Sequence, residues 1–334
     1  MWDLQLIHWL QGFGPWLVTP MKFFSALGYS GFYILFIGVV YWLIDPRLGL
    51  RLAVIAPLAS LCNFGLKLFM IEPRPYWLDP TLLALSPEKD LGMPSGHAMG
   101  TAAMWGYLAL WVGRPWFWAL CLGLLALIGL SRLVLAAHFP DQVLAGWALG
   151  GALAVAAWRL EEPLAAFLRR WPAWRIWLGL GLTAALMLLG LWLHGRLAGW
   201  TPPALWTQNA LAAAPKGGVI DPLRLKYLFA HGGALAGVVG GGAWIWGKGS
   251  FRPATSWPAR LKCLALGLAG VMLLGAAAET CYGLAPESAV GLAGMALLSM
   301  ASGAWATAVA PFYFVRLGWA MRREPVPGQA KRVE

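Results

Sequence analysis

The chain has 334 residues, of which 60% are hydrophobic and 12% are charged, and its mean hydropathy is +0.65. This composition excludes an ordinary soluble domain, because apolar runs of about 20 residues, the length of a membrane span, recur from end to end. The net charge of +11 does not indicate a nucleic-acid partner, because the basic residues are scattered over short loops and form no stripe.

The hydrophobic pattern predicts an all-α, polytopic membrane helix bundle with about nine transmembrane helices. Residues 1–25 are amphipathic, and we expect them to form a lead-in at the membrane interface. The spans are expected at residues 26–44, 50–71, 95–112, 117–137, 141–158, 174–194, 226–247, 261–282 and 288–316.

No internal repeat and no long flexible linker divides the chain, so we expect one integral membrane domain over residues 1–334. Its expected parts are the interfacial lead-in at 1–25, catalytic core spans at 26–158, accessory spans at 159–316 and a basic cytoplasmic tail at 317–334.

The distribution of Lys and Arg predicts the orientation, because cytoplasmic loops carry an excess of both. Most of the 25 lie on one side of the predicted spans: Arg47, Arg51, Arg114, Arg159, Arg169, Arg170, Arg175, Lys248, Arg252, Arg260, Lys262, Arg316, Arg322, Arg323, Lys331 and Arg332. We therefore expect a cytoplasmic C-terminus, with the loops 72–94, 131–142 and 194–225 on the outer face. A bacterial inner membrane with a periplasmic site is expected, and the endoplasmic reticulum with a luminal site is the alternative.

A first polar cluster joins Lys67, near the end of the second predicted span, to Arg74 in a Glu-Pro-Arg-Pro sequence. The prolines end the helix and stiffen the loop. A snorkelling lysine beside an interface arginine is the plain alternative. Two fixed cations at membrane depth are costly, however, and such residues usually serve a function.

A second cluster, Pro94-Ser95-Gly96-His97, opens the third predicted span. Ser95 is suited to cap the helix, whose first N–H groups form an anion site. Gly96 allows a ligand to approach the backbone closely. An ordinary capped helix start would explain Ser95 and Gly96, but it would not explain the imidazole of His97 beside an anion site.

A third cluster comprises Ser131 and Arg132 at the end of the fourth span, and His138 six residues later. The guanidinium of Arg132 can hold two phosphate oxygens. His138 needs a hydrogen-bond partner on its second ring nitrogen, and either Asp141 or Gln142 is close enough in sequence to supply it.

Together the clusters offer three cations, a helix N-terminus and two imidazoles, which is a set suited to binding a phosphate and cleaving its ester. No group of Asp, Glu and His has metal-ligand spacing, and the four cysteines lie in apolar runs without a Cys-x-x-Cys pair. We therefore expect no metal and no other cofactor.

These motifs resemble the three-part signature of the type-2 phosphatidic acid phosphatase superfamily. The parts are Lys67 with Arg74-Pro75, residues 94–97, and Ser131-Arg132 with His138. The amino-acid sequences at 74–77, 94–102, 130–132 and 135–146 are similar to those of the glucose-6-phosphatase catalytic subunit branch. The specific resemblance covers residues 60–150, and beyond residue 158 it is thin.

The resemblance implies a role for each residue. His138 would be the nucleophile that forms a phosphohistidine, and His97 the general acid for the leaving alkoxide. Lys67, Arg74 and Arg132, with Ser95 and the Gly96 N–H, would hold the phosphate. Most of the superfamily has Asp four residues after the nucleophile, where this chain has Gln142. Because Asp141 precedes it, both stay open as the residue that orients His138, and Gln142 matches the branch.

The expected function is a membrane phosphomonoesterase that acts on a soluble sugar phosphate such as glucose 6-phosphate. The alternatives are a phosphatase of lipid phosphates (an isoprenoid diphosphate, phosphatidate or phosphatidylglycerophosphate) and a lipid phosphotransferase. A transporter is disfavoured, because the sequence shows no repeat symmetry or paired broken helices. The expected partners are the phosphorylated small molecule and membrane lipids, and the sequence does not predict an oligomeric state.

Overall fold

The computed structural model describes residues 2–170 and 174–323, and these residues are predominantly α-helical. The α-helices are α1 (Trp2–Gly12), α2 (Pro15–Ala26), α3 (Ser30–Val39), α4 (Pro46–Met70), α5 (Pro75–Leu78), α6 (Gly96–Val112), α7 (Pro115–Val134), α8 (Pro140–Arg170), α9 (Trp174–Arg196), α10 (Ala204–Ala213), α11 (Lys226–Gly247), α12 (Trp257–Leu284), α13 (Ala289–Ala304) and α14 (Ala310–Arg316). The shorter elements are the π-helices η1 (Val40–Ile44) and η3 (Trp305–Val309), the 3-10 helix η2 (Pro215–Gly217), and the strands β1 (Phe251–Arg252) and β2 (Met321–Arg322). The all-α prediction is confirmed.

The spans agree with the expected ones in number only approximately. Within the described residues, seven helices are long and apolar enough to cross a membrane, and a bent pair of helices makes up to eight. The bent pair joins Pro15–Ala26 to Ser30–Ile44 at an angle of 52°. Helix α6 has 17 residues and corresponds to the span expected at 95–112. The last expected span, 288–316, is α13, η3 and α14 in succession.

Proline and glycine set the helix ends that matter for the site. Proline occupies the first turn of α5 and α7, where its missing N–H costs no helical hydrogen bond. Ser95 caps α6, because its side chain accepts a hydrogen bond from the N–H of Ala98. Gly113 ends α6 in the left-handed region, with φ of 64°. The helix boundaries near the site therefore follow from local chemistry.

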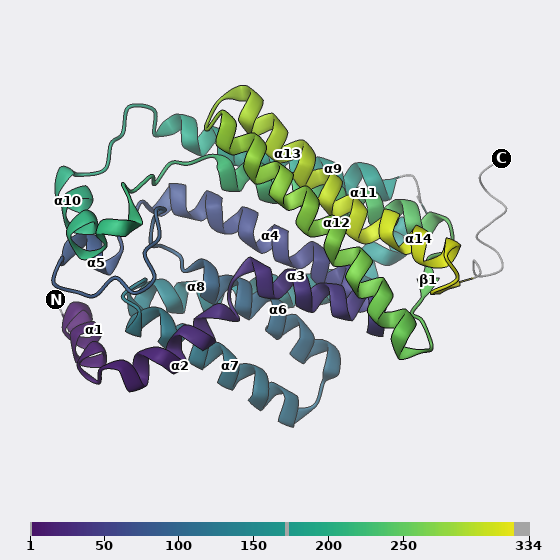
Figure 1. Cartoon of the computed structure of the whole chain (residues 1–334), viewed down its shortest axis with the longest axis horizontal. Helices are drawn as coiled ribbons and strands as arrows, with labels where there is room; N and C mark the ends of the chain where they lie inside the picture. Colours follow the sequence, from purple (N-terminus) through teal and green to yellow (C-terminus); the bar gives the residue numbers. More distant parts are fainter. Residues whose placement is uncertain (1, 171–173, 324–334) are drawn as a thin grey trace. The chain divides into compact units, whose positions relative to one another are not determined.

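The described residues form two compact units, each built from several stretches of the chain. The first unit combines Met1–Tyr33, Ala59–Pro163 and Leu188–Arg224, and it contains all the predicted site residues. In it α2 and α6 pack against α7, and α10 packs against α5 (Figure 1). Its core includes the fully buried side chains of Tyr76 and Trp77. The return segment 188–224 therefore belongs with the site, although it lies beyond residue 158.

The second unit combines Ile34–Leu58, Leu164–Met187 and Leu225–Glu334. Helix α13 packs along α11 and α12 (Figure 1). Glycines on α11 permit this close approach: a Cβ atom added to Gly237 would lie 2.0 Å from the backbone oxygen of Met300. This unit carries none of the predicted site residues.

Candidate active site

A tight turn after α7 presents His138. Ala136 takes the left-handed backbone conformation, with φ of 53°. The N–H groups of Ala137 and His138 both donate to the carbonyl of Arg132, over 2.9 and 3.2 Å. The turn therefore holds the guanidinium at the end of α7 and the imidazole that follows it in a fixed relation.

The hydrogen bonds of His138 define which ring nitrogen carries the proton. Arg74 Nη1 lies 3.2 Å from His138 Nε2, and because arginine can only donate, Nε2 must be the unprotonated nitrogen. His138 Nδ1 lies 3.1 Å from Gln142 Oε1 and donates its proton there. The Gln142 amide is itself held in place, since its Nε2 donates to the carbonyl of Pro73 over 2.8 Å. Nε2 therefore carries the lone pair of the ring, and in this arrangement that lone pair accepts a hydrogen bond from Arg74.

Asp141, the second candidate for orienting His138, points elsewhere. It is exposed, and its Oδ1 accepts a hydrogen bond from the backbone N–H of Gln142 over 2.8 Å. The Gln142 amide is enclosed instead: a Cβ atom added to Gly92 would lie 2.6 Å from Gln142 Nε2 and from the carbonyl of Pro73. Of the two candidates, Gln142 is the one in contact with the ring.

Lys67 and Arg74 meet at one carboxylate. Arg74 Nη2 donates to Asp90 Oδ1 over 2.6 Å, and the ammonium of Lys67 pairs with Asp90 Oδ2. Arg74 also donates from Nε to the backbone carbonyl of Asp90 over 2.6 Å and from Nη1 to the carbonyl of Ala137 over 2.8 Å. Both cationic side chains are buried. Burial on this scale requires a counter-charge, and Asp90 supplies it.

Arg132 is fully buried and faces the same loop. Its Nη2 lies 3.3 Å from Glu88 Oε1, and its Nη1 donates to Ser25 Oγ over 2.6 Å and to Ser86 Oγ over 3.4 Å. Its Nε is buried without a hydrogen-bond partner among the described residues. An unpartnered guanidinium N–H at this depth is a donor that an incoming anion can use.

His97 stands at the first turn of α6, with one ring nitrogen unused. Its ring makes an edge contact with Tyr29 at 4.5 Å between centroids, and Gly28 leaves space for it, since an added Cβ atom would lie 2.4 Å from His97 Cδ2. His97 Nε2 is buried and has no hydrogen-bond partner among the described residues. The site thus holds a second imidazole with a free nitrogen.

Ser95 and Gly96 lie at the base of that turn. Ser95 Oγ accepts from the N–H of Ala98, and its own N–H donates to the carbonyl of Gln142 over 2.9 Å. A Cβ atom at Gly96 would come within 3.2 Å of Asn63 Oδ1. This places the start of α6 against α4 and α8, so the predicted residues all belong to one cluster in the first unit.

The charges of the cluster act strongly on its loop groups. Partial burial opposes ionisation of Asp90, but the charges of Lys67 and Arg74 outweigh it and hold the pKa of Asp90 well below its usual range. Burial lowers the pKa of His138 well below its ordinary value of 6.5, and the charges of Arg74 and Arg132 lower it further. The His138 ring is therefore neutral at physiological pH in the ligand-free protein.

Sequence reasoning missed Glu88 and Asp90, the two carboxylates that face the three cations. The signal that points to them is charge balance, since buried Lys and Arg are almost always paired. The loop at 72–94 carries four acidic residues: Glu72, Asp79, Glu88 and Asp90. The sequence alone does not say which of the four reach the cations.

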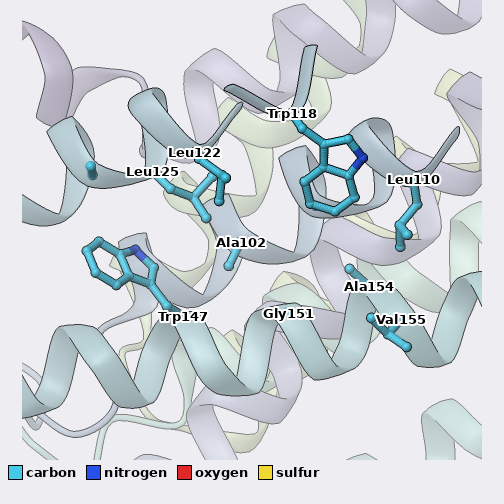
Figure 2. A pocket seen from close by; sticks show the side chains of 11 residues that line it. Ala102, Leu110, Trp118, Leu122, Leu125, Trp147, Gly151, Ala154 and Val155 are labelled. Carbon is cyan, nitrogen blue, oxygen red and sulfur yellow. The ribbon is translucent and has the colours of Figure 1, made fainter. Parts of the chain in front are cut away.

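A cavity of about 430 Å³ is lined by residues of α6, α7 and α8, and none of the predicted site residues lines it. Its lining is apolar, and Figure 2 shows the indoles of Trp118 and Trp147 on either side of Leu122 and Leu125. A cavity without titratable groups cannot carry the chemistry of ester cleavage, but it can accept an apolar chain.

Several known proteins are similar in sequence to part of this chain. Glucose-6-phosphatase catalytic subunit 1 of Canis lupus familiaris is 32% identical over 154 residues, which cover 37% of this chain and 43% of that protein. The Mus musculus protein of the same name is 28% identical over 244 residues, which cover 63% of this chain and 65% of that protein. Sphingosine-1-phosphate phosphatase 2 of Mus musculus is 32% identical over 152 residues, or 43% of each chain. The chain therefore spans about half the length of these relatives. No solved structure matches it significantly.

Two family models match separate parts of the chain. The PAP2 superfamily model matches residues 48–165, which include every predicted site residue. The model described as PAP2 superfamily phosphatase, transmembrane extension, matches residues 229–322 in the second unit. With both models matched in order, and with the polar cluster assembled within the first of them, the chain belongs to the PAP2 superfamily.

Proposed function

We propose that this chain is a membrane-embedded phosphomonoesterase that works through a phosphohistidine on His138. One observation carries the proposal: Gln142 holds the proton on Nδ1, so that Nε2 presents its lone pair beside Arg74. Such a neutral, oriented imidazole is an activated nucleophile. Lys67, Arg74 and Arg132 would hold the phosphate that it attacks.

The reaction would run in two steps. In the first, His138 Nε2 attacks phosphorus and the bond from phosphorus to the ester oxygen breaks, while a proton passes from His97 to the leaving alkoxide. In the second, water attacks the phosphohistidine, the P–N bond breaks, and His97 accepts a proton from the water. A dianionic phosphate beside His97 favours the protonated ring that the first step needs.

The three cations would supply the electrostatic stabilisation. Lys67, Arg74 and Arg132 can share the negative charge that spreads over the phosphoryl oxygens in the transition state. The first N–H groups of α6, next to Gly96, add oriented donors, and Ser95 caps that turn. This division of labour assigns no step to a metal ion, and the described residues contain no group of three His, Cys, Asp or Glu side chains arranged to bind one.

The substrate we propose first is a soluble sugar phosphate of the glucose 6-phosphate type. This proposal is supported by the resemblance of the motif sequences to those of glucose-6-phosphatase catalytic subunits. It is also supported by the identity of 32% to the Canis lupus familiaris protein. The return segment 188–224 also supports it, because Asn209 on α10 donates to the carbonyls of Trp77 and Leu78 beside the site. A segment held beside the site by such polar contacts suits a small polar substrate that arrives from water.

The apolar cavity along α6, α7 and α8 favours a second candidate, a lipid phosphate. The same three helices carry His97, Arg132 and Gln142 near one end, so an apolar chain in the cavity would run along helices that reach the site. The similarity to sphingosine-1-phosphate phosphatase 2 points the same way. The phosphoryl chemistry would be unchanged, and only the leaving group would differ. Transfer of the phosphoryl group to an alcohol is the remaining variant.

The test is phosphate release by the purified protein in detergent, from glucose 6-phosphate and from a panel of lipid phosphates, with and without an added alcohol acceptor. We expect release from the sugar phosphate, complete loss in His138→Ala, and little change in His194→Ala, a histidine outside the cluster. Acid-labile ³²P on the protein, absent from His138→Ala, would identify the phosphohistidine. Release of phosphate from lipid phosphates alone would mean that the substrate is a lipid phosphate and not a sugar phosphate. Activity retained by His138→Ala would overturn the mechanism.

A further inference from the structure

Two carboxylates of the loop at 72–94 contact the cations of the site. Asp90 bridges Lys67 and Arg74, while Glu88 lies on Arg132. These two carboxylates, here called the acidic pair, are two residues apart and between them meet all three of the predicted phosphate-binding cations. They take positions that a bound phosphate would need.

The loop that carries the acidic pair is held at several points. Tyr76 donates its hydroxyl proton to the carbonyl of Glu88 over 2.6 Å and accepts from the N–H of the same residue over 2.9 Å. The N–H of Asp221, in the return segment, donates to the carbonyl of Lys89 over 3.0 Å. The carboxylates are thus placed on the cations by a fixed backbone, and they are not loose surface groups that happen to pair.

Arg74 connects the acidic pair to the nucleophile. Its Nη2 holds Asp90, while its Nη1 donates to His138 Nε2, the atom that would attack phosphorus. A nitrogen lone pair that accepts a hydrogen bond is not available for attack. The guanidinium must leave Nε2 and turn its donors to a phosphate before His138 can react, and that turn also breaks its bond to Asp90.

We propose that the acidic pair is an internal substitute for the substrate, and that it selects for phosphates that carry two negative charges. This proposal rests on the proposed function of the site. The acidic pair contributes two negative charges, and a phosphate monoester contributes about −1.5 to −2 at neutral pH. A monoester therefore replaces the pair with little change in charge. A phosphodiester carries a single charge and leaves the buried cations under-compensated, which is costly.

The displaced carboxylates have somewhere to go. The side chains of Asp90 and Glu88 are 28% and 27% exposed, whereas those of Arg74 and Arg132 are 1% and 0% exposed. The acids can therefore turn into water while the cations stay buried. The exchange replaces one anion by another at cations that stay buried.

The experiment measures binding without turnover, by titration calorimetry of the full chain in detergent. The probes are inorganic phosphate at pH 8, where it is mainly a dianion, and dimethyl phosphate, which is a monoanion. We expect Asp90→Asn to bind inorganic phosphate about tenfold more tightly than the unmodified chain, because the charge that competes for Lys67 and Arg74 is lost. Glu88→Gln should act in the same direction. The preference for inorganic phosphate over dimethyl phosphate should fall in both variants.

Two further variants separate charge from shape. Asp90→Glu keeps the negative charge and should bind inorganic phosphate as weakly as the unmodified chain. Asp79→Asn removes a carboxylate of the same loop that pairs with His8 and Thr81 and not with the cations, and it should change nothing. Each variant is first shown to be folded by its thermal unfolding.

Unchanged or weaker phosphate binding in folded Asp90→Asn and Glu88→Gln would overturn the proposal and leave the acids as fixed supports of the cations. The result is independent of catalysis. If the variants bind phosphate more tightly but the protein hydrolyses no phosphate ester, the proposed role of the acidic pair is supported and the proposed phosphatase function is overturned. If the protein hydrolyses phosphate esters but the variants bind phosphate as the unmodified chain does, the phosphatase function is supported and the proposed role of the acidic pair is overturned. If no folded variant binds inorganic phosphate, both fail.

Discussion

The amide of Gln142 contacts His138, Phe139 and Pro73 at once, so it fixes the imidazole through a single rigid group. Gln142→Ala should lower kcat by about 10- to 100-fold, as loss of an orienting partner commonly does. Gly92→Ala leaves Gln142 in the sequence but should produce the same defect by displacing its amide, because the added Cβ atom would lie 2.6 Å from Gln142 Nε2.

Asp141→Asn is the matched control for this prediction. Its side chain can still accept the hydrogen bond from the N–H of Gln142, and it makes no contact with His138, so activity should be retained. Phosphate release by the purified variants is the measurement. A larger loss in Asp141→Asn than in Gln142→Ala would show that the acid, and not the amide, orients the nucleophile.

The pKa of His138 gives a prediction about pH. Because the folded-state pKa lies well below 6.5, the ring should stay neutral at pH 6 in the ligand-free protein. The unfolded chain binds more protons in that window, so His138 contributes stability above pH 6.5 that is lost as the pH falls toward the folded pKa. NMR of ¹⁵N-labelled histidine, with the resonance assigned from a His138→Gln spectrum, should show a neutral ring at pH 6. A ring that is half protonated at or above pH 6.5 would contradict the burial seen here.

The sequence predicted the histidines and cations of the site, but it did not predict the carboxylates that pair with those cations. His97, His138 and the three cations stand out because ionisable side chains at membrane depth are rare. The residue that orients His138 could be predicted only as either Asp141 or Gln142, because residues three and four positions along a helix are both within reach. Glu88 and Asp90 were missed, since a loop of 17 residues between α5 and α6 gives no periodicity from which to place a carboxylate.

Close packing of α6 against α8 sets the relation between His97 and Gln142. A Cβ atom at Gly150 would lie 2.2 Å from the backbone oxygen of Met99, so Gly150→Ala must push the helices apart. We expect a loss of about 1–3 kcal/mol in stability, as for other overpacked cores, together with a fall in activity.

Gly151 provides the control on the same helix. An added Cβ atom there meets nothing within 4 Å, so Gly151→Ala should gain stability by up to about 1 kcal/mol from helix propensity. Because Gly151 lines the apolar cavity and not the polar cluster, hydrolysis of a sugar phosphate should be unchanged. Thermal unfolding in detergent and phosphate release are the two measurements. Equal effects of both substitutions would mean that the interhelical contact at Gly150 does not position the site.

Helix positions were largely predictable, and helix breaks were not. Most spans were located within a few residues, because apolar length is dictated by the bilayer and prolines mark several starts. The break between α2 and α3 falls where the lead-in (1–25) was expected to meet the first span (26–44), but its bend of 52° was not predicted. The reason is tertiary: Gly28 lies in the break and makes room for the ring of His97, a contact that no local pattern reveals.

The charge asymmetry of the whole chain predicts its orientation. A single candidate span, α11 (Lys226–Gly247), separates the segment around Lys216 from the hairpin around Arg252. The first of these belongs to the return segment near the site, and the second lies in a basic loop. Because basic loops stay in the cytoplasm, Lys216 should lie outside and Arg252 inside.

Single cysteines at these two exposed positions test the prediction in a bacterial host, on a background in which the four native cysteines are replaced. Lys216→Cys should react with a membrane-impermeant maleimide in intact cells, and Arg252→Cys should react only after the inner membrane is permeabilised. The opposite pattern would place the site in the cytoplasm, where a sugar phosphate is supplied by cytosolic metabolism and not from outside. Labelling of both positions from one side would mean that α11 does not cross the membrane, because one span between two loops must put them on opposite faces.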